Sequence, residues 1–580
     1  MTGEIKGDAR FGDAEFSPTE LEIKGPLTDL AWGTEGGVTQ FGVLGDAYVE
    51  IGDGARVDTN DAIIGFFGSA QAQVDVHSGG RLQSNNVTIG LFDSEATSGV
   101  TLEDDSKWSL AGFLEVGRIG QAKVEVLENS TLDVQGLVVL SSDVDSTSDV
   151  RVESANGLST EATFEVGRRG DALLTVAGGG RVVSEGDAFL GTFQEGVGSV
   201  VVERDSVFAA NGNLNIGNGA ADGPADGVNG TGSFAIKDGG QLILADGKEI
   251  RIGRRNGSVG TLTISGADAV VSSDGEGPVT VNVGVDGQGE LIVEKGFKLD
   301  TEKIDVNLGR TGLGKGTLTI KDVGTEISYK DAVVGEDGIG LFRVQQGATA
   351  RVQERLVIGE SNTEVMSELT VTGQNSTLEV GKEIVIGESG SGALIVEQGG
   401  KVSLNDDGFE RITLGKNADS RGELTIKGKA ATVDFDVNVG QLVIGDEGEG
   451  TLKLVDGGLF ILTKPTKDQI TLAAKNSSTA NIEVSGREGD QPSRLGLDSD
   501  VIIGAVGTAD VTVSDGGLLQ GRPGADITAI VGGSDDAGGS ESNKGTGKVT
   551  ITGKDSQWQV PGTLVIGNAE GVGTVRVAGG

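Results

Sequence analysis

The stretch Gly440–Gly458, GQLVIGDEGEGTLKLVDGG, contains a short apolar strand ending in Ile-Gly, an acidic glycine-rich corner, a second alternating strand and a Gly-Gly turn. The same phrase returns at Gly381–Gly400 (GKEIVIGESGSGALIVEQGG) and at Gly562–Gly580 (GTLVIGNAEGVGTVRVAGG). Self-similarity at a nearly regular period is typical of proteins built from stacked repeats. The repeat therefore decides the fold class.

Within each repeat, apolar residues alternate with period two, which predicts strands and not helices. Leu442 and Ile444 illustrate the first strand, Leu424 and Ile426 the second, and Val402 the shorter third strand after the Gly-Gly turn. Three short strands per repeat predict an all-β fold, a single parallel β-helix (β-solenoid) of about 20 coils of about 25 residues. Each strand would pair with its equivalents in the neighbouring coils at about 4.8 Å.

The residue between the two apolar positions of the first strand is unrestricted. It is a threonine, a glutamate or an asparagine in many repeats, as at Thr88, Glu115, Glu165, Asn215 and Asn282. Because successive side chains of a strand point to opposite faces, we expect this position to face solvent in many coils.

The corner after the first strand needs a sharp change of direction, and glycine reaches a positive φ without steric cost. The apolar-glycine step recurs at intervals of 23 to 36 residues, which defines twenty repeats. In two of them the glycine is replaced, by Ser141 and by Ala473. We expect these two corners to bend differently from the others.

The domain organisation follows from the repeat. Residues 1–40 match it weakly and are predicted to be an N-terminal cap or a degenerate first coil, whereas residues 41–580 form the β-helix repeats. Two corners are enlarged, at residues 217–232 and 532–547, and residues 486–500 form an insertion after a second strand. Long loops on a rigid scaffold often carry function. Tolerated insertions without a role are the alternative interpretation.

The composition excludes several classes of partner and compartment. Lysine and arginine number 46 against 87 acidic residues, a formal charge of −41 that should repel nucleic acids and anionic lipids. The chain has no cysteine and no apolar run of about 18 residues, so we expect no disulfides and no membrane insertion. Its first residues lack the apolar core of a signal peptide, which suggests a processed or excised part of a longer chain.

Two motifs resemble functional sites and are better explained by the repeat. The histidine at His77 has no cysteine or second histidine to complete an ordinary zinc site, and we expect an exposed turn residue. Gly309–Gly316 (GRTGLGKG) approaches a phosphate-binding loop, but a glycine follows Lys315 where the magnesium-binding hydroxyl is needed. A strand pattern follows it where a helix would be required, so this motif is a repeat corner.

The sequence leaves the role of one adhesive motif and of three acidic motifs open. Arg169-Gly170-Asp171 is the tripeptide read by some adhesion receptors, although chance explains it in a chain this rich in glycine and aspartate. Asp104-Asp105, Asp406-Asp407 and Asp535-Asp536 supply oxygen ligands that suit calcium, or else they are solvated corners. We identify no catalytic constellation, and predict no catalytic, cofactor-binding or metal residues, with calcium as the open alternative.

The recurring phrase VIG-x-x-G-x-G-x-L-x-V-x-x-GG-x-L resembles the passenger repeats of bacterial autotransporters. The strongest local match lies within Gly547–Gly571, where VTITGKDSQWQVPGTLVIGNAEG has a valine-rich strand, a glycine, Ser-x-Trp and a strand ending in Ile-Gly. The resemblance implies an exported β-helix that is displayed at or released from the cell surface, often as an adhesin. The chain lacks the family's translocator barrel and signal peptide, and similar repeats occur in bacterial surface and matrix proteins without a barrel.

These observations predict a non-enzymatic structural or adhesive β-helical rod, extracellular or at a bacterial cell surface. The last repeat stops at Gly573–Gly580 before its third strand, so we also expect end-to-end stacking of copies into fibres, with an unknown glycan or protein ligand. One alternative is a polysaccharide-binding or polysaccharide-cleaving β-helix, in which carboxylates from adjacent coils would act as a pair. Another is a calcium-stabilised spacer without a partner.

Overall fold

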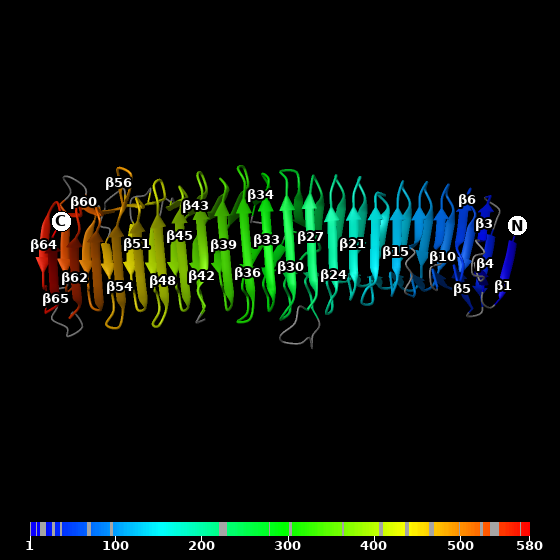
Figure 1. The fold of residues 1–580 in the computed structure, drawn as a ribbon, viewed down its shortest axis with the longest axis horizontal. Helices are drawn as coiled ribbons and strands as arrows, with labels where there is room; N and C mark the ends of the chain where they lie inside the picture. Colours follow the sequence, from blue (N-terminus) through cyan, green and yellow to red (C-terminus); the bar gives the residue numbers. More distant parts are fainter. Residues whose placement is uncertain are drawn as a thin grey trace. The chain divides into compact units, whose positions relative to one another are not determined.

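The computed structural model describes most of the chain, and its regular elements there are all strands (Figure 1). The chain divides into two compact units, Met1–Leu291 and Ile292–Gly580. Since the described residues form no helix, none of them provides a helical membrane span. The described residues are 2–6, 9–11, 19–25, 29–34, 37–66, 71–92, 97–219, 229–275, 277, 279–300, 304–361, 365–404, 410–435, 440–462, 469–497, 499–521, 526–533, 544–568 and 570–579.

Unit 1 consists of three parallel sheets that wind around one core. Sheet B contains the strands that end in the apolar-glycine step: β2 (Ala9–Phe11), β5 (Val38–Phe41), β8 (Asp61–Ile64), β11 (Val87–Ile89), β14 (Leu114–Val116), β17 (Val138–Leu140), β20 (Phe164–Val166), β23 (Ala188–Leu190), β26 (Leu214–Ile216), β29 (Glu249–Ile252) and β32 (Val279–Val283). Sheet C contains the second strands: β3 (Thr19–Lys24), β6 (Ala47–Gly52), β9 (Ala72–Val76), β12 (Ser98–Leu102), β15 (Gln121–Val126), β18 (Thr147–Val152), β21 (Asp171–Val176), β24 (Val197–Val202), β27 (Thr231–Lys237) and β30 (Val259–Ser265). Sheet A contains the third strands: β1 (Thr2–Lys6), β4 (Asp29–Thr34), β7 (Arg56–Thr59), β10 (Arg81–Ser84), β13 (Lys107–Leu110), β16 (Thr131–Val134), β19 (Gly157–Thr160), β22 (Arg181–Ser184), β25 (Val207–Ala210), β28 (Gln241–Leu244) and β31 (Val270–Ser273).

Unit 2 repeats the same winding, and β33 (Gln288–Glu294) contains the division between the units. The strands of sheet B here are β35 (Ile304–Leu308), β38 (Ala332–Val334), β41 (Arg355–Ile358), β44 (Glu383–Ile386), β47 (Glu410–Leu414), β50 (Gly440–Ile444), β53 (Gln469–Leu472), β58 (Asp500–Ile503), β61 (Thr528–Val531) and β64 (Thr563–Ile566). Those of sheet C are β36 (Lys315–Lys321), β39 (Ile339–Gln345), β42 (Ser367–Thr372), β45 (Ser391–Glu397), β48 (Arg421–Lys427), β51 (Glu449–Val455), β54 (Thr479–Ser485), β59 (Thr508–Ser514), β62 (Thr546–Thr552) and β65 (Val572–Ala578). The third strands form sheet D: β34 (Lys298–Asp300), β37 (Glu326–Tyr329), β40 (Thr349–Val352), β43 (Thr377–Val380), β46 (Lys401–Leu404), β49 (Thr432–Phe435), β52 (Leu459–Leu462), β57 (Arg494–Leu497), β60 (Leu518–Gly521) and β63 (Gln557–Gln559).

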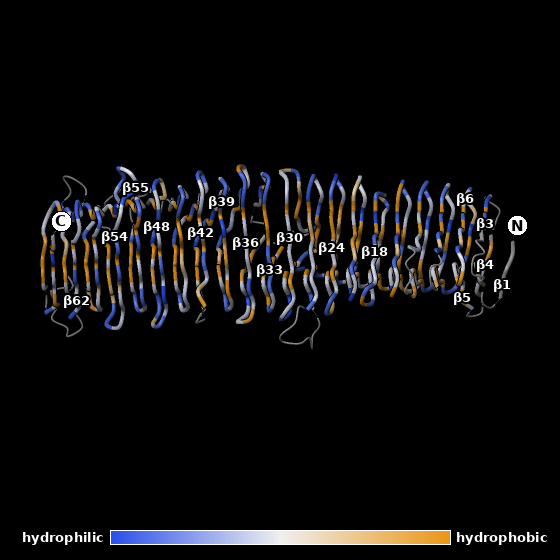
Figure 2. The backbone as a smooth tube through the Cα atoms, in the orientation of Figure 1, coloured by the Kyte–Doolittle hydropathy of each residue, from blue (hydrophilic) through white to orange (hydrophobic). Residues whose placement is uncertain are grey.

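Equivalent residues of successive coils pair directly, as the repeat predicts. In sheet C, Leu424 of β48 pairs with Leu452 of β51, and Ile426 pairs with Leu454. All four side chains are fully buried, so each row of inward residues forms an aliphatic ladder through the core. Figure 2 shows the resulting alternation of hydrophobic and hydrophilic residues along the strands. The prediction of an all-β parallel β-helix with three strands per coil is confirmed.

The expectation that Ser141 and Ala473 would bend their corners differently is wrong. Both residues have a φ of 54°, in the same left-handed region as Gly445 at 69°. Ser141 holds this conformation with its hydroxyl, which lies 2.8 Å from Ser148 Oγ and donates a hydrogen bond to the carbonyl oxygen of Asp171 at 2.6 Å. The geometry of the stack therefore overrides the backbone preference of the residue at the corner.

The inserted segments are only partly described. The insertion at 486–500 forms a short antiparallel hairpin of β55 (Arg487–Glu488) and β56 (Gln491–Pro492), and then continues into β57. The hairpin lies on neighbouring corners, where Glu488 accepts a hydrogen bond from the backbone N–H of Lys429 and Gln491 donates one to the Gly457 carbonyl. In the enlarged corners 217–232 and 532–547, residues 220–228 and 534–543 lie outside the described residues. The cap assigned to residues 1–40 stays a prediction.

Candidate functional surfaces

The residue expected to be exposed, His77, is partly buried in a polar cluster on the outer face of sheet C. Its Nε2 lies 2.7 Å from Glu50 Oε1, and its side chain is 17% exposed. A Cβ atom on Gly52 would lie 2.4 Å from the imidazole, so that glycine leaves the space the ring occupies. Hydrogen bonds from Lys24 and then His77 lower the pKa of Glu50. The prediction of an exposed turn residue is therefore wrong, because the preceding coil supplies a partner.

The other sequence motifs lie at corners. Gly309–Gly316 leads directly into β36, which begins at Lys315, as the corner interpretation requires. Arg169 and Gly170 lie in the corner before β21, Asp171 is the first residue of that strand, and the Arg169 guanidinium lies over the Phe193 ring at 5.6 Å. Asp104-Asp105 forms a turn with positive φ at both residues.

Asp406-Asp407 and Asp535-Asp536 lie outside the described residues. Among the residues that are described, no three acidic or histidine side chains gather as a metal site would require. Calcium binding stays a prediction.

The outer face of sheet B differs from the expectation of solvent exposure. The middle residues Asn215 and Asn282 point outward, yet both are fully buried, and Thr88 is 8% exposed. Long side chains at the edges of the face cover this middle row. In unit 2, Arg355 on one edge reaches Glu388 on the other at 2.6 Å, and so crosses the row that contains the buried Val385. The face is therefore shielded at these residues, as a polar layer in unit 1, and the expectation is wrong for them.

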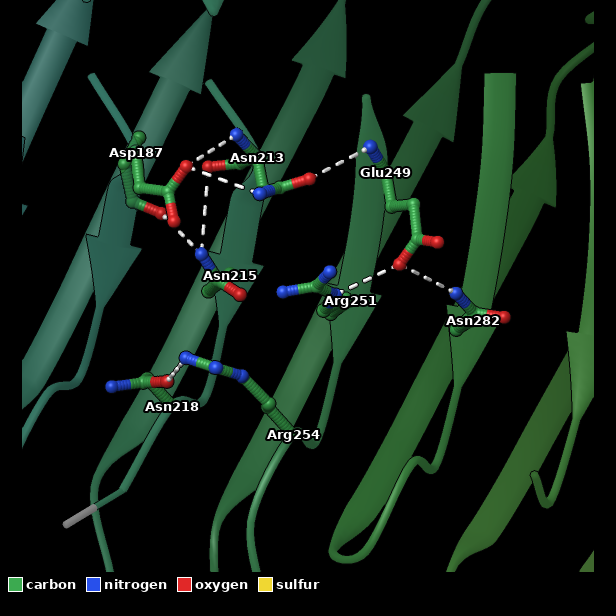
Figure 3. A network of polar contacts seen from close by, with 9 residues as sticks. Asp187, Asn213, Asn215, Asn218, Glu249, Arg251, Arg254 and Asn282 are labelled. Carbon is green, nitrogen blue, oxygen red and sulfur yellow. Dashed lines mark hydrogen bonds and ion pairs between the residues drawn. The ribbon is translucent and has the colours of Figure 1, made fainter. Parts of the chain in front are cut away.

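From β23 to β32 in unit 1, a network of hydrogen bonds links this layer from coil to coil (Figure 3). Asn213 donates to Asp187 from its backbone N–H at 2.8 Å and from its side-chain amide at 3.1 Å. Its own amide oxygen accepts from the backbone N–H of Glu249 at 3.2 Å, and Glu249 in turn accepts from Asn282 at 3.3 Å and from Arg251 at 2.9 Å. These bonds fix the register of four successive strands.

The same layer contains polar atoms without a hydrogen-bond partner. They occur in four consecutive coils, as Ser142 Oγ, Glu165 Oε2, Thr192 Oγ1 and Asn215 Oδ1. Glu165 Oε2 lies 3.3 Å from Arg168 without hydrogen-bond geometry, and burial raises the pKa of Glu165 while Arg168 partly offsets this. Unpaired buried polar atoms are uncommon in native proteins, so this layer is a place where ordered water fits.

A local excess of positive charge lies beside the network. Arg254 donates to the neutral side chain of Asn218 at 2.9 Å (Figure 3). Burial, and then the charges of Arg255 and Arg251, lower the pKa of Arg254. In a chain with a net charge of −41, this coil is an exception to the acidic surface.

A hollow of about 530 Å³ lies on the outer face of sheet A in unit 1. Side chains of four consecutive strands, β10, β13, β16 and β19, and of the residues that follow them form its walls and floor. At its centre Asp133 accepts hydrogen bonds from Lys107 Nζ at 2.6 Å and from Ser159 Oγ at 2.8 Å. The lining residues are Gln83, Ser84, Lys107, Ser109, Leu110, Ala111, Asp133, Val134, Gln135, Ser159 and Glu161.

Inspection of single motifs misses the polar layer on sheet B and the hollow on sheet A. Each of these surfaces is formed by residues of different coils that share a row. Gln83, Ser109, Asp133 and Ser159 are direct register partners from coil to coil. Writing the repeats one under another would have placed these residues in a single column. The small side chains at Ser109 and Ser159 beside long neighbours were the available signal.

Comparison with known proteins gives a weak and partial likeness. No family model matches the chain. An Escherichia coli K12 protein named "Uncharacterized lipoprotein YdeK" is 24% identical over 312 residues, which is 41% of this chain. The match spans 23% of that relative's own length.

Proposed function

We propose that the chain is a non-enzymatic structural and adhesive part of a bacterial cell-surface protein. The observation that carries this proposal is the contrast between the two faces of every strand. The inward rows keep the same aliphatic ladder through many coils, whereas the outward rows change from coil to coil. Such a scaffold holds changing surface residues at fixed spacing, which suits contact with extended partners. The lipoprotein name of the distant relative supports a membrane-associated or surface location.

Ion pairs between neighbouring coils support a structural role for part of the outer face. In unit 2, Glu388 contacts Arg355 and Lys416, each at 2.6 Å. Burial by itself would raise the pKa of Glu388, but these two cations outweigh it and lower the pKa. A carboxylate held between two cations in this way suits a structural ion-pair ladder.

Protease treatment of intact cells tests the location. A protease added to bacteria that express the full gene product should remove the epitopes of this chain before the cells are lysed. Protection of those epitopes until lysis would refute the surface location. Adhesion is then measured with a strain that lacks the coding region for residues 1–580, which should bind fewer host or matrix surfaces.

End-to-end stacking is a further part of the proposal. In the coil that contains β64 and β65, Leu564 is 42% exposed, Ile566 50% and Val577 75%. One coil earlier, the register partners of Leu564 and Ile566 are Ala529 and Val531, which are at most 2% exposed. A further coil, from the rest of a longer chain or from a second copy, would continue the same ladders. Sedimentation of the purified chain should show association that grows with concentration and is lost in an Ile566→Lys variant, and a monomer at all concentrations would refute stacking.

A further inference from the structure

We propose that the hollow on the outer face of sheet A binds a neutral, hydroxyl-rich oligosaccharide segment. This inference rests on the proposed adhesive function, to which it gives a ligand class and a place in the fold. The argument uses the shape of the hollow, its charge and its hydrogen-bonding groups.

The shape follows from the sizes of the outward side chains. Ser109, Ala111 and Ser159 are small, whereas Gln135 and Glu161 beside them are long. The volume of the hollow, about 530 Å³, falls within the range of small-molecule sites. The hollow is partly open to solvent, so it can receive an internal segment of a polymer as well as a free end.

The charge balance disfavours an anionic ligand. Lys107 and Asp133 form an ion pair at 2.6 Å, so their charges compensate each other. With Glu161, the charged side chains of the lining carry a formal charge of −1. A phosphate, sulfate or uronate group would meet repulsion here. The lining therefore favours an uncharged ligand.

The hydrogen-bonding groups match hydroxyls. Asp133 is held by Lys107 and Ser159 in one orientation and keeps lone pairs that accept from further donors. Arg56 donates to the amide oxygen of Gln83, which leaves the amide nitrogen of Gln83 as the group that donates to a ligand. A sugar hydroxyl both donates and accepts, so one ring satisfies groups of both kinds.

Apolar atoms complete the lining. Leu110 and Val134 border the hollow but face the core, at 1% and 2% exposed, so Ala111 is the exposed apolar side chain of the lining. A C–H face of a sugar ring can pack against it while the hydroxyls reach the polar side. A small hydrocarbon ligand would cover the remaining lone pairs of Asp133 and the amide nitrogen of Gln83 without giving them partners, so the polar lining favours a carbohydrate.

Binding of defined tetrasaccharides to the 580-residue protein tests the proposal. The probes are cellotetraose, chitotetraose and maltotetraose, with tetragalacturonate as the acidic comparison, and binding is measured by calorimetry or by ligand-observed NMR. At least one neutral tetramer should bind, and Ser109→Leu should weaken it by about tenfold or more because leucine fills the floor. Asp133→Asn should also weaken binding, because the amide loses the charge that holds Lys107.

The matched control is Ser272→Leu. Ser272 occupies the same outward row of sheet A through the pairings Ser159–Val183, Val183–Ala209, Ala209–Ile243 and Ile243–Ser272. Because valine and isoleucine already occupy this row, leucine at either serine should leave the coil folded, and circular dichroism checks this. The control should change affinity by less than about twofold.

Three outcomes would overturn the inference: no neutral tetramer binds, only tetragalacturonate binds, or Ser109→Leu and Ser272→Leu weaken binding equally. Failure of this inference can be distinguished from failure of the proposed function. A surface-exposed chain that binds no neutral tetramer refutes only the inference, whereas a chain that binds one and is absent from the surface refutes only the location.

Discussion

Replacement of Phe208 by alanine tests whether the core behaves as a local stack. Phe208 lies in β25 of sheet A and is fully buried. Its ring makes edge-to-face contacts with Phe164 of sheet B, at 6.3 Å between centroids, and with Phe234 of sheet C, at 5.3 Å. The three rings come from three successive coils and from all three sheets, so they join the sheets across the core.

The expected cost follows from the volume lost and from the inability of the coils to close around it. Large-to-small substitutions of a buried phenylalanine cost about 3–5 kcal/mol, and each edge-to-face pair accounts for about 0.5–1.5 kcal/mol of such a total. Phe208 pairs with Val182 on one side and with Leu242 on the other, so ladder hydrogen bonds hold its backbone in both directions. We therefore expect about 4–5 kcal/mol for Phe208→Ala, and about 1–2 kcal/mol for Phe208→Leu, which keeps most of the volume.

Hydrogen exchange measured by mass spectrometry shows how much each coil is destabilised by the substitution. In a stack where each coil contacts its neighbours, a cavity should weaken protection in the adjoining coils more than in distant ones. Peptides that cover β22 to β28 should lose protection by about a thousandfold, since every 1.4 kcal/mol is a factor of ten. Peptides that cover β44 and β47 should keep theirs. A loss below about tenfold at β25 would mean that the cavity collapses, and an equal loss in all coils would refute local stability.

Three further substitutions test single interactions. Ala473→Gly should stabilise its coil by roughly 0.5–1 kcal/mol in urea unfolding, because φ there is 54° and alanine is strained at that value; an unchanged midpoint would contradict this. Glu488→Ala removes the acceptor for the Lys429 N–H and should increase exchange of that amide, at a cost of about 0.5–1.5 kcal/mol; unchanged exchange would mean that the hairpin does not hold the corner. Burial raises the pKa of Glu165, and Arg168 only partly offsets this shift. The stability that protonated Glu165 contributes is therefore present below pH 4.5, the ordinary glutamate pKa, and is lost as the pH rises through the folded-state pKa of Glu165. Glu165→Gln should therefore be more stable than wild type at pH 7 and lose this advantage near pH 4, and the reverse trend in urea midpoints would refute the assignment.

The inward half of the fold could be predicted because its signal is local. Whether Leu424 and Ile426 face the core depends on the period of their own strand, which is visible in a few residues. Their burial and their pairing with Leu452 and Leu454 follow from that period and from the repeat. The three-strand coil was therefore readable from a single unit.

The outward half could not be read in this way, because it depends on the neighbouring coil. Asn215 has the sequence context of an exposed residue, yet the network of Asn213, Glu249 and Arg251 lies beside and above it and leaves it fully buried. His77 likewise gains its partner Glu50 from a residue 27 positions earlier. Predicting such contacts requires the exact register of two coils and the lengths of their side chains, which a single unit does not contain.

The separation of the two faces also explains why surface chemistry can change along this chain without loss of the fold. One outward row of sheet A consists of Gln83, Ser109, Asp133, Ser159 and Val183. The residue before each of these faces inward and is at most 5% exposed: Leu82, Trp108, Leu132, Leu158 and Val182. The inward row fixes the backbone, so the outward row is free to run from polar to apolar within a few coils. Local patches therefore depart from the average of the chain, as Arg251, Arg254 and Arg255 in and after β29 and the hollow over β13 do. We therefore expect functional sites in such a scaffold to span three or four coils, each site with its own ligand chemistry. The net charge of −41 says little about any one of these sites.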